Sequence, residues 1–167
     1  AVDTETNSLD PHQADLVGVS LSSKIGKACY IPIGHKSNKC IEKDLVLKKL
    51  KPLLEDPSIK KIGQNIKFDF IVFFKHGINM TSMEDTMLMS YVLDAGKNRH
   101  NMDTLSEIHL NHKTISFKDL VGTGKKEINF SEVDVEKAKD YAAEDADITF
   151  RLYKKFQKSL KDEKMIN

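Results

Sequence analysis

Apolar and polar residues alternate in three short segments near the start of the chain, over residues 2–5, 16–22 and 27–33. The turn-rich segment NSLDPHQAD separates the first two segments, and KIGK separates the second from the third. Short segments in which apolar and polar residues alternate, bounded by turn-forming residues, are typical of β-strands. The pattern therefore predicts an antiparallel meander of three strands, and residues 59–64 are predicted to form a fourth strand.

Apolar residues take a helical spacing later in the chain. Between residues 43 and 55, leucines recur among lysines and predict a helix whose apolar positions are Leu45, Leu50, Leu53 and Leu54. The other predicted helices span residues 68–76, 85–93, 101–110 and 134 to about 160. Strands early and helices later predict an α/β fold, in which a mixed β-sheet (an antiparallel meander plus a parallel strand) is flanked by helices.

The size and composition of the chain fit one domain. At 167 residues and 40% hydrophobic composition, residues 1–167 are expected to form a single compact unit. The chain begins with Ala1 rather than methionine, directly at an expected strand, which indicates either a domain excised from a longer polypeptide or a start trimmed by disorder, and we expect the former. No apolar run approaches the roughly 20 residues that span a bilayer, which argues against a membrane role.

Charge and cysteine content narrow the classes of function further. The formal net charge is +1, with 31% charged residues, so the chain has no overall basic field for nucleic-acid binding and any such contact must be local. Cys29 and Cys40 have neither zinc-ligand spacing nor the density of a disulfide scaffold, which predicts reduced thiols in a cytoplasmic protein. Cys29 is expected in the core of a strand.

The most informative residues are acidic. Asp3 and Glu5 lie two apart in AVDTET, so on a strand their carboxylates share one face, about 7 Å apart along the backbone, where one metal ion could bridge them. Taken alone, such a pair more often lies on a solvated strand by chance. An unpaired carboxylate in an apolar strand is costly, however, and this favours a metal site.

Two further motifs contain candidate ligands. GQNIKFD joins the fourth strand to a helix and places Asp69 in the first helical turn, where the alternative role is stabilisation of the helix N-terminus. Tyr141 and Asp145 in YAAED are four residues apart and therefore share a helix face. The amides of Gln64 and Asn65 could contact a substrate sugar or phosphate, or simply form the turn.

Together, DTET, GQNIKFD and YAAED resemble the three motifs of the DEDDy exonucleases, and most closely the 3′-5′ proofreading domain of bacterial DNA polymerase I. The resemblance extends through YIPIGH, LKPLLED, EDTMLMSYVLDAG, RHNMDTLSE and HKTISFKDLVGTGK. It implies a ribonuclease H-like fold. It also implies the polymerase domain of the same parent chain as a partner, and hydrolysis of the terminal phosphodiester at a single-stranded DNA 3′ end, with release of nucleoside 5′-monophosphates.

The resemblance also implies metal-binding roles for the acidic residues. Asp3, Glu5 and Asp145 would hold one divalent metal ion, and Asp3 with Asp69 a second. Oxygen ligands suit Mg²⁺ or Mn²⁺, and Zn²⁺ is a further candidate. An unperturbed tyrosine pKa near 10 makes Tyr141 a poor general base at neutral pH, so it is expected to orient the attacking water.

Substrate contacts are implied for a second group of residues. Leu9 would wedge against the last base and Phe117 would pack on it, although either side chain could be ordinary core. Phe68 stands where relatives often carry tyrosine, and Arg99 would contact phosphate unless it is only surface charge. The full set of expected substrate contacts is Thr6, Leu9, Gln64, Asn65, Phe68, Arg99 and Phe117.

Two rival functions remain open from the sequence. One is a stand-alone DEDDy exoribonuclease, and the other is a catalytically silent module that supports a polymerase. The intact acidic residues and tyrosine favour an active nuclease. The isolated domain is expected to be a monomer from the bacterial cytoplasm, associated with the nucleoid, and unable to synthesise DNA without a polymerase domain.

Overall fold

The computed structural model describes residues 1–37 and 39–166, except for the side chain of Lys125. The strands are β1 (Val2–Thr6), β2 (Leu16–Lys24), β3 (Lys27–Pro32), β4 (Lys61–Gly63) and β5 (Met83–Asp85). The helices are α1 (Lys43–Glu55), α2 (Lys67–Lys75), α3 (Thr86–Asp94), α4 (Met102–Leu110), α5 (Phe117–Val121) and α6 (Val135–Asp162). Two short 3-10 turns, η1 (Gly124–Lys126) and η2 (Phe130–Glu132), lie between α5 and α6.

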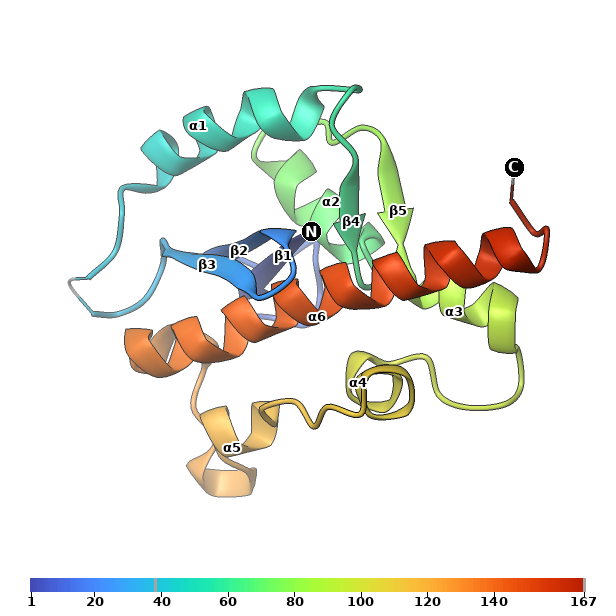
Figure 1. The fold of residues 1–167 in the computed structure, drawn as a ribbon. Helices are drawn as coiled ribbons and strands as arrows, with labels where there is room; N and C mark the ends of the chain where they lie inside the picture. The colour runs from blue at the N-terminus through green and yellow to red at the C-terminus, as the bar shows by residue number, and fades with distance from the viewer. Residues whose placement is uncertain (38, 167) are drawn as a thin grey trace.

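The strands form two sheets that lie side by side (Figure 1). One is the antiparallel sheet β1-β2-β3, and the other is the parallel pair β4-β5. The predicted meander and the mixed α/β class are therefore confirmed. The fourth strand is shorter than predicted, and its partner β5 was not predicted because its three residues are too few to show an alternating pattern.

Different helices cover the two faces of the antiparallel sheet. Val2 and Val19 pack with residues of α1 and α2 in one core cluster. The long helix α6 contacts β1, β2 and β3, and Figure 1 shows it crossing the strands. Because successive side chains on a strand alternate between faces, Asp3 and Glu5 point to the opposite face from Val2. The acidic side chains therefore lie on the face that α6 covers.

The buried side of α1 differs from the prediction. Val46, Leu50 and Leu54 are buried, whereas Leu45 and Leu53 are 48% and 40% exposed. The buried residues recur every four positions, so they line one helix face, and Val46 was missed because the leucines dominate the pattern. Within the described part of the chain, no helix combines the length and the apolar composition needed to cross a bilayer.

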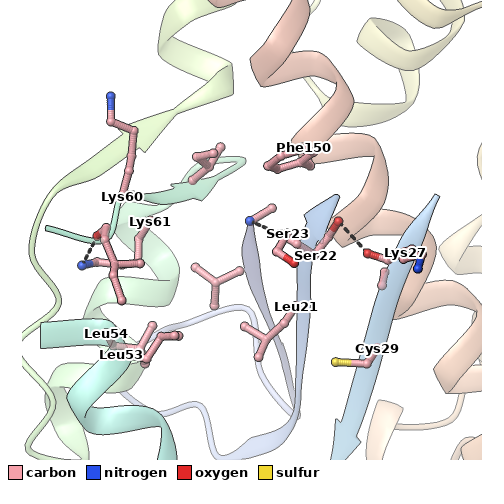
Figure 2. A pocket seen from close by; sticks show the side chains of 15 residues that line it. Leu21, Ser22, Ser23, Lys27, Cys29, Leu53, Leu54, Lys60, Lys61 and Phe150 are labelled. Carbon is pink, nitrogen blue, oxygen red and sulfur yellow. Dashed lines mark hydrogen bonds between the residues drawn. The ribbon is translucent and has the colours of Figure 1, made fainter. Parts of the chain in front are cut away.

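Cys29 is exposed, so its predicted place in the core is wrong. Its strand, β3, is the outer strand of the antiparallel sheet, and Cys29 pairs with Leu21. Figure 2 shows both side chains at a hollow of about 600 Å³ that is also lined by Leu53 and Phe150. The sheet is left uncovered here, which explains the exposed thiol.

Candidate active site

Three carboxylates converge between β1 and α6. Oxygen atoms of Asp3, Glu5 and Asp145 lie within 4.8 Å of one another. Glu5 and Asp145 are only 8% and 6% exposed. An all-oxygen group of this kind matches the ligands that hard divalent cations prefer. The structure therefore brings together the three carboxylates that the sequence resemblance would place around one ion.

Small residues bring Asp145 close to the sheet. Ala138, Ala142 and Ala146 are completely buried and recur every four residues along α6. Their short side chains allow the helix backbone to approach the strands closely, so the short Asp145 side chain can reach the carboxylates of β1. Tyr141 precedes Asp145 by one turn on the same helix.

Asp69 approaches from the other side of β1. It lies in the first turn of α2 and is 2% exposed. Its Oδ1 accepts hydrogen bonds from the backbone N–H of Thr4, at 2.9 Å, and from Thr4 Oγ1, at 2.6 Å. Thr4 was not singled out from the sequence, because only the folded chain shows that it contacts a residue 65 positions away.

The acidic residues strongly perturb one another. Burial raises the pKa of Asp3 to about 7. Burial, followed by the charge of Asp3, also raises the pKa values of Glu5, Asp69 and Asp145 well above their usual range. Carboxylates kept together in this way resist ionisation unless a cation neutralises them. The electrostatics therefore fit a site that holds divalent metal ions.

Tyr141 remains a protonated phenol in this site. Burial, followed by the charges of Asp145 and Glu5, raises its pKa above the ordinary tyrosine value. Its hydroxyl can thus donate a hydrogen bond but cannot act as a general base near neutral pH. Its ring lies 5.9 Å from Phe117 and 6.1 Å from Phe130 between centroids, so Tyr141 belongs to an aromatic group.

A cleft of about 610 Å³ opens beside Glu5. Among the residues lining it are four expected substrate contacts, namely Thr6, Leu9, Phe68 and Phe117. Leu9 is 94% exposed and Phe117 is 43% exposed, so neither is a buried core residue. Phe130 also lines the cleft and stacks on Phe117 with an angle of 3° between the rings. It was missed because a lone phenylalanine in a polar loop carries no sequence pattern.

The remaining expected contacts lie differently. Both ends of the Gln64 amide already have protein partners, since Nε2 donates to the His100 carbonyl at 2.8 Å and Oε1 accepts from Thr86. Asn65 is exposed, with a left-handed φ of 62°, and its backbone N–H donates to Asp85. Arg99 is exposed between α3 and α4 and is not among the described residues that line the cleft.

Comparison with known proteins gives consistent relatives. A family model described as 3′-5′ exonuclease matches residues 1–161. The chain is 45% identical to DNA polymerase I of Rhizobium leguminosarum, and the match covers 92% of the chain and 17% of that protein. DNA polymerase I of Pseudomonas aeruginosa gives the same identity and the same two coverages. The chain therefore spans about a sixth of the length of these relatives.

Solved structures agree with the fold. Brucella melitensis NrnC with bound Mg²⁺ has a TM-score of 0.72 and 27% identity, over 97% of this chain and 73% of that one. The ribonuclease H-like architecture implied by the sequence is confirmed by this similarity to nuclease structures. Because the family model covers nearly the whole chain and the acidic motifs converge, the chain belongs to the 3′-5′ exonuclease family that includes the exonuclease domain of bacterial DNA polymerase I.

Proposed function

We propose that this domain proofreads DNA, by hydrolysing the terminal phosphodiester of single-stranded or frayed 3′ ends and releasing nucleoside 5′-monophosphates. The observation that carries the proposal is the convergence of Asp3, Glu5 and Asp145 within 4.8 Å, next to a cleft of about 610 Å³. A mismatched terminus frays more readily than a paired one, so a site that accepts only an unpaired end removes errors preferentially.

The carboxylates would hold two divalent ions. Asp3, Glu5 and Asp145 would bind one ion, and Asp3 with Asp69 the other. Mg²⁺ or Mn²⁺ fits the oxygen ligands, the bound Mg²⁺ of the NrnC structure supports this choice, and Zn²⁺ is a further candidate. Bound ions of this kind supply an activated water at neutral pH and stabilise the charge on the departing 3′ oxygen.

The other site residues would orient the reactants. The Tyr141 hydroxyl would hydrogen-bond the attacking water, and Glu5 would help to hold it from β1. Leu9 and Phe117 would hold the terminal base, since stacking on an aromatic ring stabilises any base by roughly 1 to 3 kcal/mol. Thr6, Asn65 and Phe68 would line the path of the strand, and Arg99 would contact phosphate further along it.

The domain would act within a larger protein. Residues 1–167 would form one exonuclease domain of a DNA polymerase I, with the polymerase domain of the same chain as its partner, in the bacterial cytoplasm at the nucleoid. The relatives that contain a similar segment within a much longer polymerase chain support this arrangement. Separated from that chain, the domain would be a monomer.

Matched DNA and RNA strands carrying a label at the 5′ end would test the proposal. With Mn²⁺ present, we expect the DNA to shorten one nucleotide at a time from its 3′ end, and a duplex with a mismatched 3′ end to shorten faster than a paired one. A preference for RNA would instead support a stand-alone exoribonuclease. Intact DNA and RNA would support a catalytically silent module.

A further inference from the structure

A tyrosine and a histidine outside the proposed ligand set connect the sheet to the beginning of α6. Tyr30 lies on β3 and its hydroxyl is 2.7 Å from His35 Nε2, while His35 Nδ1 is 3.1 Å from the carbonyl oxygen of Val133. A carbonyl oxygen only accepts, so Nδ1 must carry a proton. In the neutral ring Nε2 then accepts from the Tyr30 hydroxyl. Burial lowers the pKa of His35, which favours this neutral form.

Gly18 gives the Tyr30 ring its place beside Glu5. In the sheet register, Glu5 pairs with Gly18, and Ser20 pairs with both Asp3 and Tyr30. Directly paired residues share a face, so Tyr30 lies on the carboxylate face. A Cβ atom at Gly18 would overlap the Tyr30 ring, which shows that the ring leans across this glycine. Because Gly18 has no side chain, it leaves the space that the Tyr30 ring occupies.

His35 also contacts the aromatic group of the cleft. Its ring centroid lies 5.8 Å from that of Phe130. Phe130 in turn lies 6.2 Å from Phe117 and 6.1 Å from Tyr141. Val133, which holds the other side of His35, directly precedes Asp134, the N-cap of α6. One histidine thus fixes both the helix that carries Tyr141 and the ring that supports Phe117.

We propose that Tyr30 and His35 are positioning residues of the exonuclease: together they set the placement of Phe130 and of the start of α6 against β1, and so aim the Tyr141 hydroxyl and the Phe117 ring. This inference rests on the proposed roles of Tyr141 and Phe117. Neither Tyr30 nor His35 needs to touch the substrate, because both act through the side chains that do.

A double-mutant cycle would separate positioning from general stabilisation. Tyr30→Phe removes only the hydroxyl, and we expect it to lower kcat roughly tenfold, because small misplacements of a reacting group are costly. In the Tyr141→Phe background the same change is expected to lower kcat by less than about twofold, since coupled residues are not additive. Tyr153→Phe is the control. The Tyr153 hydroxyl accepts a hydrogen bond from Gln157 at 2.9 Å, and Tyr153 lies on α6 several turns away from Tyr141. It should leave kcat unchanged.

A binding measurement gives a readout that does not depend on turnover. We expect His35→Ala to weaken the affinity for a deoxynucleoside 5′-monophosphate, measured by calorimetry, roughly fivefold through loss of stacking on Phe117. His35→Gln keeps a donor and an acceptor and should recover part of that loss. Melting temperatures of all variants would identify any that fail to fold.

Three results would overturn the inference. One is an equal loss of kcat from Tyr30→Phe in both backgrounds, another is unchanged monophosphate affinity in folded His35→Ala, and the third is a kcat loss in Tyr153→Phe equal to that in Tyr30→Phe. An inactive wild-type domain would instead contradict the proposed function. In that case the affinity measurement would still decide whether His35 positions the cleft.

Discussion

Thr4 directs the Asp69 carboxylate, although in the sequence it only separates two acidic residues. Its hydroxyl and its backbone N–H both donate to Asp69 Oδ1, which occupies one of the two carboxylate oxygens and fixes the orientation of the other. Removing a group that orients a metal ligand typically lowers metal affinity by roughly 10- to 100-fold. Thr4 is therefore expected to matter for binding of the ion assigned to Asp69.

Replacing Thr4 by valine tests this role. Thr4→Val keeps the branched side chain in the strand but removes the 2.6 Å hydrogen bond to Asp69. We expect the Mn²⁺ concentration for half-maximal exonuclease activity to rise roughly tenfold, as for other groups that orient metal ligands. Thr81→Val, which removes a hydroxyl bond to the Glu55 carbonyl, is the control and should not change it. An unchanged metal requirement in Thr4→Val would show that the backbone bond alone orients Asp69.

At the scale of single residues, the sequence predicts what depends on local spacing. Asp3 with Glu5, and Tyr141 with Asp145, lie as the periods of a strand and a helix require. The Thr4 contact to Asp69 and the Phe130 ring beside Phe117 could not be predicted, because they join distant segments. The same is true of Gln64, whose partners His100 and Thr86 lie in other elements.

At the scale of elements, one side chain joins two helix beginnings. Asp85 is the N-cap of α3, where it accepts from the Met87 N–H. It also accepts from the N–H groups of Asn65 and Ile66, at 3.0 and 3.1 Å, in the turn that leads into α2. Since Asp69 lies in the first turn of α2, Asp85 holds the segment that presents this carboxylate.

Asp85→Ala is expected to destabilise the domain. The change leaves three backbone N–H groups without their acceptor, and loss of a cap alone costs about 1 kcal/mol. With the two bonds to the α2 turn included, the total cost is about 2 kcal/mol, so we expect the melting temperature to fall by roughly 4 to 8 °C, at about 2 to 4 °C per kcal/mol for a domain of this size. Asp85→Asn keeps Oδ1 as an acceptor, so its melting temperature should fall by less. Equal melting temperatures for Ala and Asn would contradict the dual role.

The elements missed from the sequence are short. The helices predicted near α1, α2, α3, α4 and α6 are confirmed, because each spans more than two turns that contain recurring apolar residues. The strand β5, the helix α5 and the turns η1 and η2 have three to five residues each, too few to show a period. Their conformation depends on what they pack against. The positions of Phe117 on α5 and Phe130 on η2 beside the cleft could therefore not be predicted from the apolar pattern of the sequence.

At the scale of the whole molecule, the acidic site opposes folding when no metal is bound. Between an ordinary aspartate pKa and the value of about 7 for Asp3, the folded chain holds more protons at this group than the unfolded chain does. Stability contributed by this group is present below that range and is lost as the pH rises through about 7. The same direction applies to Glu5, Asp69 and Asp145, whose pKa values are also raised.

Asp3→Asn should therefore stabilise the metal-free domain increasingly as the pH rises. We expect a small increase in melting temperature at pH 5 and a larger one at pH 8, because asparagine cannot ionise and the penalty for Asp3 grows from an ordinary aspartate pKa up to about 7. With Mn²⁺ at pH 8, the wild type should instead have the higher melting temperature of the two, since ions that bind only the folded wild type stabilise it. Asp140→Asn, at an exposed position on α6, is the control. A wild type that is more stable than Asp3→Asn at pH 8 without metal would contradict the electrostatic account.

The central claim is that the convergent carboxylates form a metal-dependent exonuclease site. The most direct test compares the release of mononucleotides from labelled single-stranded DNA by the wild type and by Asp3→Asn, with Mn²⁺ and with a chelator. We expect release by the wild type only with Mn²⁺, and a loss of roughly a thousandfold in Asp3→Asn, because a metal ligand stabilises the transition state by several kcal/mol. Release by folded Asp3→Asn at the wild-type rate, or by the wild type in chelator, would contradict the claim.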